Sequence, residues 1–264
     1  MIRVEDLTKT YGDKTAIRSL SFEIPAGQVC GYLGPNGAGK STTVRTLTGT
    51  LRPDHGRVIV AGYDVAEQPL EVKRRIGYVP ETGAMYRTLS VEEYLALVGA
   101  LHHLEPAEID DRMRRFLELF GIAGSLRQRI DTLSKGMRQK VVITGALLHD
   151  PEILLLDEPL SGLDANAVQT VKELVRRLAD RGKTVFYCSH MLDVVERLCD
   201  RVIILDGGAI VADGSPQELM QAGRRKTLEH VFRSLTSADD QSAIADALVD
   251  TLTKQPPRPR QGSK

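Results

Sequence analysis

A glycine-rich segment near the start of the chain carries residues suited to bind a phosphorylated ligand. Its members match the spacing G-x-x-x-x-G-K-[ST]: Gly34, Pro35, Asn36, Gly37, Ala38, Gly39, Lys40 and Ser41, followed by Thr42. In such a loop, backbone N–H groups at the start of a helix converge on phosphate oxygens, while the lysine adds positive charge and the hydroxyl binds Mg²⁺. A turn that only links a strand to a helix would need neither Lys40 nor Ser41. We therefore expect this segment, Thr42 included, to bind a nucleoside triphosphate with magnesium.

Two adjacent carboxylates follow a wholly apolar segment later in the chain. Residues 153–156 are Ile-Leu-Leu-Leu, and Asp157 and Glu158 come directly after them. Such a segment predicts a buried parallel strand, which places both acids at the sheet edge where open α/β sheets bind ligands. Asp157 is suited to hold Mg²⁺, and Glu158 to polarise the water that attacks a γ-phosphate. An isolated acidic pair would equally fit a solvated turn, but the phosphate loop upstream favours a metal and hydrolysis site.

A histidine is predicted to reach the same edge of the sheet. His190 follows the expected strand at residues 184–189, so it should emerge beside Asp157. A lone histidine after a strand is more often structural than catalytic, since its near-neutral pKa does not by itself establish a task. Together with the phosphate loop and the acidic pair, His190 is a candidate for contact with the γ-phosphate.

The elements that would position these residues begin with a β layer and pass into an α/β core. Alternating apolar residues at 2–7 and 16–24 flank a turn-rich tetrad at 11–14, which predicts antiparallel strands. Residues 28–33 read as a strand that enters the phosphate loop, and residues 40–47 as the helix that leaves it. Residues 57–61 and 76–79 predict further short strands.

The middle of the chain has the spacing of helices. Apolar residues recur at three- and four-residue intervals over 91–104 and 107–120, and Ser134 opens a third helix that runs to about residue 149. Strand and helix alternate again after residue 153, with helices at 165–181 and 192–198 and strands at 184–189 and 202–205. Short helices are expected after Ser215, at 228–235, and at 244–252.

These patterns predict an α/β fold of the P-loop NTPase type, with an antiparallel β subdomain and an inserted α-helical subdomain at about residues 84–150. We expect one nucleotide-binding domain over residues 1–237 and a C-terminal extension at 238–264. The last part of that extension, residues 254–264, holds three prolines, four cations and no large apolar residue, and is expected to be disordered.

Composition narrows the classes of partner. Lys and Arg together number 35 and Asp and Glu also number 35, so no net charge would draw the chain to nucleic acid or to an acidic bilayer. No apolar stretch approaches the roughly 20 residues that cross a bilayer, and the charged start of the chain lacks a secretory signal. These features favour a cytoplasmic protein. Cys30, Cys188 and Cys199 lie in apolar surroundings and read as buried, inert thiols.

Several of these segments together resemble the nucleotide-binding domain of ABC (ATP-binding cassette) ATPases over residues 2–214. They are Tyr11, the phosphate loop, residues 133–137 (Leu-Ser-Lys-Gly-Met), Asp157 with Glu158, residues 161–164 (Ser-Gly-Leu-Asp) and His190. Lys135 and Met137 replace a glycine and a glutamine of the family signature L-S-G-G-Q. This variant is similar to the one common among ABC-2-type exporter ATPases.

The resemblance implies roles for further residues. Tyr11 would stack on the adenine, and its alternative is an ordinary tyrosine at a strand end. Ser134 and Gly136 would reach across a dimer to the γ-phosphate bound by the other subunit, although locally Ser134 is a helix cap. Glu81 stands where the family usually has a glutamine that links the Mg²⁺ site to the membrane partner; its alternative is a surface glutamate. Asp164 would lie in the loop that joins two cassettes and also cap the next helix.

By the same resemblance the chain is expected to be the ATP-binding and ATP-hydrolysing subunit of an ABC exporter. It would work as a nucleotide-sandwich dimer with a second copy or a homologous subunit, peripheral on the cytoplasmic face of the membrane, with a transmembrane permease as a separate chain. A soluble ABC ATPase that acts on a macromolecular complex is the alternative, but the chain has one cassette, no long heptad repeat and no net basic charge. A module that binds ATP without useful hydrolysis is disfavoured by Asp157, Glu158 and His190.

Overall fold

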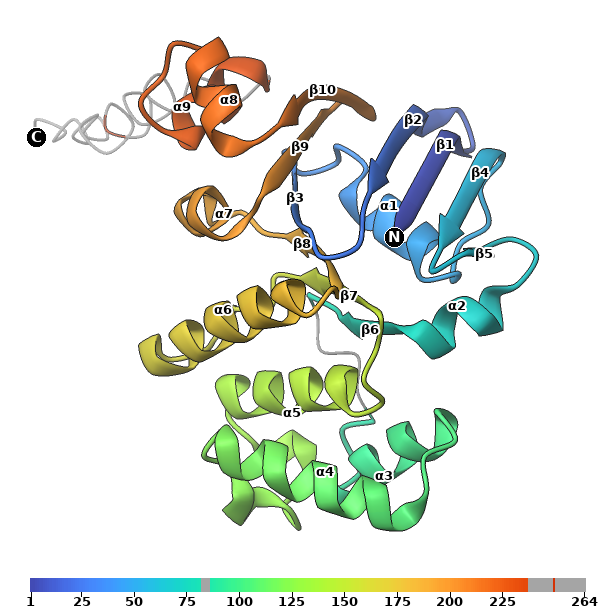
Figure 1. The fold of residues 1–264 in the computed structure, drawn as a ribbon, viewed down its shortest axis with the longest axis vertical. Helices are drawn as coiled ribbons and strands as arrows, with labels where there is room; N and C mark the ends of the chain where they lie inside the picture. The colour runs from blue at the N-terminus through green and yellow to red at the C-terminus, as the bar shows by residue number, and fades with distance from the viewer. Residues whose placement is uncertain (82–85, 237–248, 250–264) are drawn as a thin grey trace, which may run out of the picture.

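The computed structural model describes residues 1–81, 86–236 and Val249. Its elements form two β-sheets with helices between and around them (Figure 1). The helix expected at 244–252, apart from Val249, the disordered tail expected at 254–264 and the first residues of the expected helical insertion lie outside the described residues.

The N-terminal layer is a four-stranded antiparallel sheet in the order β2-β1-β4-β5. Its strands are β1 (Ile2–Tyr11), β2 (Lys14–Ile24), β4 (His55–Val60) and β5 (Tyr63–Asp64). β1 and β2 form the expected hairpin, because their alternating residues place one apolar face toward the core. The hairpin turn between them lies next to Tyr11, the last residue of β1.

The central sheet has six strands in the order β10-β9-β3-β8-β7-β6. All neighbours pair in parallel except β9 and β10, which are antiparallel. The strands are β3 (Val29–Leu33), β6 (Ile76–Val79), β7 (Ile153–Asp157), β8 (Thr184–Cys188), β9 (Arg201–Asp206) and β10 (Ala209–Gly214). This order matters for function. β3 leads into the phosphate loop, β8 leads to His190, and β7 ends in the acidic pair. These three strands are direct neighbours in the sheet.

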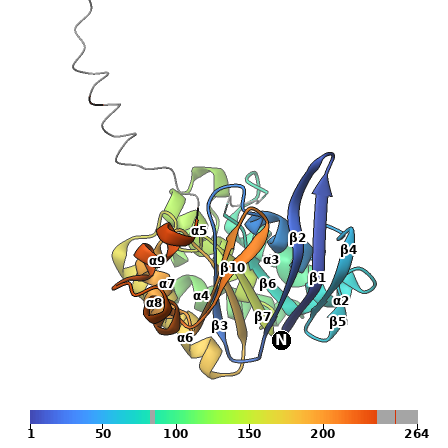
Figure 2. The same ribbon diagram turned by 90° about the horizontal axis from the view of Figure 1, so that it is seen from above.

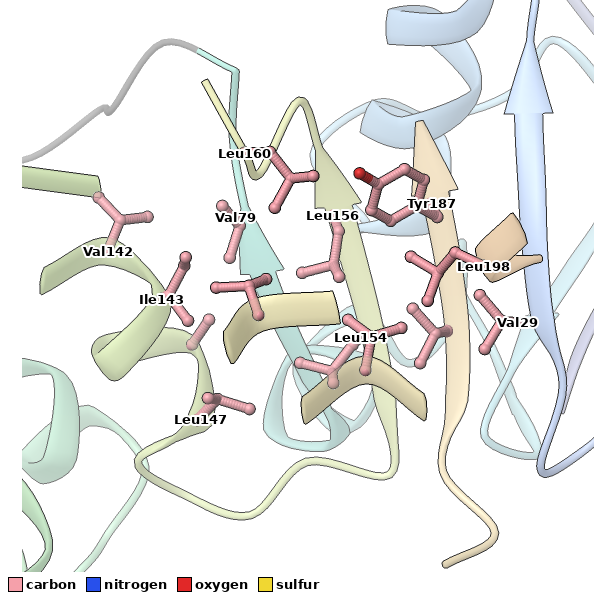
Figure 3. Close-up of a cluster of buried hydrophobic side chains, with 14 of the residues drawn as sticks. Val29, Val79, Val142, Ile143, Leu147, Leu154, Leu156, Leu160, Tyr187 and Leu198 are labelled. Atoms are coloured by element: carbon pink, nitrogen blue, oxygen red, sulfur yellow. The ribbon is translucent and has the colours of Figure 1, made fainter. Parts of the chain in front are cut away.

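Both faces of this sheet are buried, which explains why its strands are continuously apolar. In β7, Ile153 and Leu155 join the cluster facing the four-stranded sheet, whereas Leu154 and Leu156 join the cluster on the opposite face. Figure 3 shows the second cluster, where Leu154 and Leu156 of β7 lie between Val79 of β6 and Val29 of β3. The buried thiols were correctly expected: Cys30, Cys188 and Cys199 are all buried and unpaired in disulfides.

Helices cover the two faces unequally. α1 (Lys40–Leu47) packs between the two sheets through Val44 and Leu47. On the other face lie α6 (Ala165–Asp180) and α7 (Leu192–Leu198), followed by α8 (Pro216–Ala222) and α9 (Leu228–Leu235). Seen from above, α6 to α9 lie on the side opposite β1, β2 and β4 (Figure 2).

The middle of the chain forms the expected helical block. It comprises α3 (Val91–Leu101), α4 (Pro106–Leu119) and α5 (Lys135–Leu147), with short 3₁₀ helices at Ala123–Ser125 and Ile130–Thr132. Its apolar residues belong to the same hydrophobic cluster as one face of the central sheet. The helical block and the sheet therefore share one core, to which α5 contributes. Ser134 caps α5 as predicted: its Oγ accepts a hydrogen bond from the Met137 N–H at 3.2 Å.

Five elements were not predicted: β5, β10, α2 (Pro69–Arg75) and the two 3₁₀ helices at Ala123–Ser125 and Ile130–Thr132. Four helices also end before the predicted residue: α3 at Leu101 instead of 104, α4 at Leu119 instead of 120, α5 at Leu147 instead of 149 and α6 at Asp180 instead of 181. His103 has a left-handed φ of 60°, which ends α3. β10 escaped notice because it is a sheet edge without fully buried side chains, so its apolar alternation is weak.

Candidate nucleotide-binding site

One pocket of about 850 Å³ lies at the edge of the central sheet where the parallel strands end. It collects most residues singled out in the sequence. They are Tyr11, Gly34, Pro35, Asn36, Gly37, Gly39, Lys40, Ser41, Thr42, Glu81, Asp157, Glu158 and His190. Ala38 is absent from the lining because it is buried and its N–H donates to the Pro35 carbonyl at 3.2 Å.

The strand order brings these residues together although they are far apart in sequence. β8 lies between β3 and β7, and Asp157 at the end of β7 pairs with Cys188 at the end of β8. The chain therefore leaves three neighbouring strands at one edge, into the phosphate loop, into Glu158 and into His190. This is the edge at which parallel α/β sheets bind ligands.

The phosphate loop depends on glycine at its last turn. Gly39 has a φ of +108°, and a Cβ there would lie 2.7 Å from the Ala16 carbonyl oxygen of β2. A Cβ at Gly34 would lie 2.8 Å from the Leu205 carbonyl oxygen. Gly39 also occupies the N-cap of α1 without any side-chain cap, so the first N–H groups of this helix are left for a ligand.

Lys40 lies folded over the same loop. Its Nζ donates hydrogen bonds to the carbonyl oxygens of Gly34 at 2.6 Å and Pro35 at 3.1 Å. The ammonium is thus held at the mouth of the loop, where a phosphate oxygen could replace a carbonyl as its acceptor. Behind the loop, Thr43 contacts both the Gly39 carbonyl at 3.2 Å and the Tyr32 hydroxyl at 2.9 Å, which fixes α1 to β3.

Glu158 is anchored directly to the loop that carries His190. Its Oε1 accepts a hydrogen bond from the His190 backbone N–H at 2.8 Å and lies 2.9 Å from His190 Nδ1. Its Oε2 accepts from the Ser189 hydroxyl at 3.1 Å. The Glu158 side chain is only 13% exposed, whereas the His190 side chain is 82% exposed. The structure therefore joins the two predicted catalytic residues, and Ser189 is a partner that sequence reasoning missed.

Asp157 lies in a strongly negative part of the pocket. Burial, together with the charges of Glu81 and Glu158, raises its pKa to about 6, although Lys40 acts in the opposite direction. Crowded carboxylates of this kind favour a cation at the site. Asp157, Glu81 and the Ser41 hydroxyl line one pocket and offer the oxygen ligands that Mg²⁺ prefers.

The described residues hold no group of three His, Cys, Asp or Glu side chains placed to bind a metal by themselves. This arrangement fits Mg²⁺, which is usually bound by one or two carboxylates together with substrate phosphates and water. The residues present are thus compatible with a magnesium ion that arrives with a nucleotide.

Aromatic and apolar side chains also line the pocket. Tyr11 is 46% exposed at the end of β1, and its ring lies under Lys9, whose Nζ is 5.9 Å from the ring centroid. Leu192 of α7 and Phe232 of α9 are further lining residues. Phe232 was not predicted as a site residue, because its position results from α9 packing on α7 and not from any local motif.

Ser134 and Gly136, which are predicted to act on the nucleotide of a second subunit, do not line this pocket. Ser134 is exposed at the N-terminus of α5, and a Cβ on Gly136 would lie 2.6 Å from the Gly162 carbonyl oxygen. Asp164 caps α6 as predicted, because its carboxylate accepts from the Ala167 N–H at 2.9 Å. Within the described ranges, none of the helices combines the length and the apolar character needed to cross a bilayer.

Comparison with known proteins places this site in a family context. The model of the family described as ABC transporter matches residues 17–161. The chain is 38% identical over 240 residues to the ABC transporter ATP-binding protein NatA of Bacillus subtilis (strain 168), covering 89% of this chain and 97% of that protein. It is 36% identical over 219 residues to a Nod factor export ATP-binding protein I of Rhizobium etli, covering 83% and 69%.

Solved structures agree with this result. The structure of an ATP-binding subunit of an ABC transporter superposes with a TM-score of 0.84 at 32% identity, covering 89% of this chain and 99% of that chain. A dimeric bacterial ABC transporter cassette superposes with a TM-score of 0.76 at 25% identity, covering 81% and 98%.

Proposed function

Because this chain belongs to the ABC transporter family of ATP-binding proteins, we propose that it is the ATP-hydrolysing subunit of a membrane exporter. Two kinds of similarity support the proposal. One relative that the chain matches over most of its length is named as an export ATP-binding protein. The signature variant with Lys135 and Met137 is of the type found in ABC-2-type exporters.

ATP binds at the pocket between Tyr11 and the carboxylates. The phosphate tail takes the N-terminus of α1, where uncapped N–H groups and the Lys40 ammonium favour negative charge. The adenine takes the exposed ring of Tyr11, whose face suits an aromatic base. Mg²⁺ supplies positive charge that neutralises the phosphate oxygens, and Ser41, Asp157 and Glu81 would hold it.

Hydrolysis depends on Glu158 and His190. Glu158 polarises a water, whose oxygen bonds to the γ-phosphorus while the bond from that phosphorus to the β–γ bridging oxygen breaks. The products are ADP and inorganic phosphate, and the proton leaves the water toward Glu158. His190, held 2.9 Å from the Glu158 carboxylate, orients the carboxylate and contacts the γ-phosphate.

Two subunits complete each site. Ser134 and Gly136 lie away from the pocket of their own chain, and the exposed N-terminus of α5 suits a phosphate of a second subunit. The dimeric arrangement of a related cassette supports this pairing. ATP would close the dimer and hydrolysis would reopen it.

A separate transmembrane permease receives this motion. The described helices do not cross a bilayer, so vectorial transport requires a partner chain that does. The helices α3 to α5 form the proposed docking surface, which would hold the protein on the cytoplasmic face of the membrane. Purification from native membranes should recover a polytopic protein with this chain; recovery of a ribosomal or chromosomal complex instead would favour the soluble alternative.

The observation that carries the ATPase assignment is the Glu158 carboxylate fixed beside His190 at the edge shared with the phosphate loop. We predict that Glu158→Gln retains ATP binding by calorimetry but lowers steady-state phosphate release by about 100-fold or more, because polarisation of the water is lost. ATP should then hold the variant as a dimer in size-exclusion chromatography with light scattering. Glu173→Gln, which changes an exposed carboxylate on α6, is the matched control. Wild-type turnover in Glu158→Gln would refute the assignment.

A further inference from the structure

Lys135 occupies a position where a local rule disfavours it. It is the first residue of α5, directly after the Ser134 cap, and α5 has no acidic residue in its first turn. A cation at the N-terminus of a helix is repelled by the helix dipole, and acids are preferred there. A residue that breaks a local preference needs a compensating contact, and such positions are often functional.

Contacts with the loop after β7 compensate for the unfavourable position of Lys135. Lys135 Nζ donates a hydrogen bond to Ser161 Oγ at 2.8 Å. Its aliphatic stem lies against Gly162, where a Cβ would come within 2.8 Å of both Cγ and Cδ of Lys135. Gly162 has a φ of +79°, so this position favours glycine for its conformation and also for its space. The stem and the ammonium of Lys135 are thus both matched by the loop.

A second, buried contact runs parallel to the first. Gln139, one helical turn further along α5, is 6% exposed, and its Nε2 donates to the Pro159 carbonyl at 3.0 Å. In addition, Lys140 Nζ lies 3.5 Å from Oδ2 of Asp164, the N-cap of α6. The first turns of α5 therefore hold the whole segment from 159 to 164.

This segment begins immediately after the acidic pair. Glu158 precedes Pro159, and Ser134 precedes Lys135, so each end of the contact adjoins a residue of a different nucleotide site in the dimer. Glu158 would act on the nucleotide of its own chain, and Ser134 on that of the partner.

We propose that Lys135 is a positioning residue that pins the loop at 159–164 to the N-terminus of α5. This contact, called the pin below, couples Ser134, which would bind the partner subunit's phosphate, to Glu158, which would polarise water in its own site. The inference rests on the proposed function, since it requires a dimer in which α5 faces a second nucleotide. It goes beyond that function because it assigns Lys135 and Ser161 a role in positioning the loop at 159–164.

A double-mutant cycle on the full chain tests the pin. Lys135→Met keeps the aliphatic stem and removes the donor, and Ser161→Ala removes the acceptor. We expect each to lower kcat for MgATP roughly threefold to tenfold, with the Kd for ATP unchanged within about twofold, and the double variant to be no slower than either single one. Lys135→Arg, which retains a charged donor, should restore most of the turnover. Lys73→Met, which removes an exposed ammonium on α2, is the control and should match the wild type.

Each result separates the pin from the function on which it rests. Wild-type kcat in Lys135→Met, or losses that multiply in the double variant, would overturn the pin while leaving the ATPase assignment intact. A wild-type chain without ATPase activity would overturn the assignment and the pin together. Melting temperatures within about 2–4 °C of the wild type, the shift that corresponds to about 1 kcal/mol, identify folded variants. If a variant falls outside that range, its ATP-dependent dimerisation is measured instead, in the Glu158→Gln background. A dimer that forms as it does in the Glu158→Gln chain with Lys135 intact would also overturn the pin.

Discussion

At Gly39 a single backbone conformation determines whether the phosphate loop can form. Its φ of +108° lies where side chains are rarely tolerated, and the Ala16 carbonyl leaves no room for a Cβ. We expect Gly39→Ala to lower the free energy of unfolding by about 1–3 kcal/mol, measured by urea denaturation. Gly124→Ala is the matched control, because a Cβ there meets open space and its φ is not positive. Equal stabilities of the two variants would show that the loop can relax around the added methyl group.

At the scale of elements, a pair of histidines joins the helical block to the core. His102, the C-cap of α3, stacks on His149 with ring centroids 3.5 Å apart. His149 Nε2 lies 3.0 Å from the Ile76 carbonyl, which can only accept, so Nε2 is the donor. Nδ1 of His149 is buried without a partner among the described residues. The ring is therefore held in its neutral form between α3, α5 and β6.

This neutral ring should make stability depend on pH. Burial, together with the nearby His102 and Arg112, lowers the pKa of His149 to about 4, although the Ile76 carbonyl and Asp150 act in the opposite direction. The unfolded chain, with an ordinary histidine pKa of about 6.5, binds more protons between these values. The free energy of unfolding should therefore fall as pH decreases from 6.5 to 4, and this contribution should be complete above 6.5.

We predict that His149→Gln, which keeps a donor for the Ile76 carbonyl, loses this part of the pH dependence in chemical denaturation series. His55→Gln, at an exposed position of β4, serves as the control and should keep the wild-type slope. If His149→Gln and the wild type show the same slope between pH 6.5 and 4.5, the ring does not carry the effect.

At the scale of the whole molecule, the proposed site is shared between two chains. The pocket is lined by the phosphate loop, the carboxylates and His190, whereas Ser134 is exposed at the N-terminus of α5 and does not line it. We expect Ser134→Glu, made in the Glu158→Gln background, to abolish the ATP-dependent dimer, because its carboxylate would face the partner's γ-phosphate. Light scattering with ATP and with ADP measures this directly.

Ser215→Glu is the matched control for loss of a cap. Ser215 caps α8 through the Glu218 N–H, as Ser134 caps α5 through the Met137 N–H. Both substitutions remove a cap that contributes about 1 kcal/mol, but only one of them places a charge at the proposed interface. A dimer that forms equally in both variants would argue against the composite site.

Local patterns in the sequence were sufficient for much of the fold and most of the site. The helices α1, α7 and α9 begin and end at the predicted residues, because caps and apolar spacing act within a few residues of each other. The phosphate loop with Lys40 and Ser41 is a short motif of fixed spacing, and so is the acidic pair, because the chemistry of each requires that spacing along the chain. Parallel strands then bring their ends to one edge, which is why His190 could be expected beside Asp157.

Other features were decided by pairing and packing between elements. β10 exists because it pairs with β9, and its own residues, none of them fully buried, carry no strong strand signal. Phe232 enters the pocket wall only because α9 packs on α7, and Lys135 meets Ser161 only because α5 lies beside the loop after β7. The contacts of Phe232 and Lys135 join residues 26 or more positions apart, so no local periodicity records them. The sequence by itself determined which groups could bind and cut a triphosphate, whereas the tertiary structure decided which groups support them, because support comes from contacts across the fold.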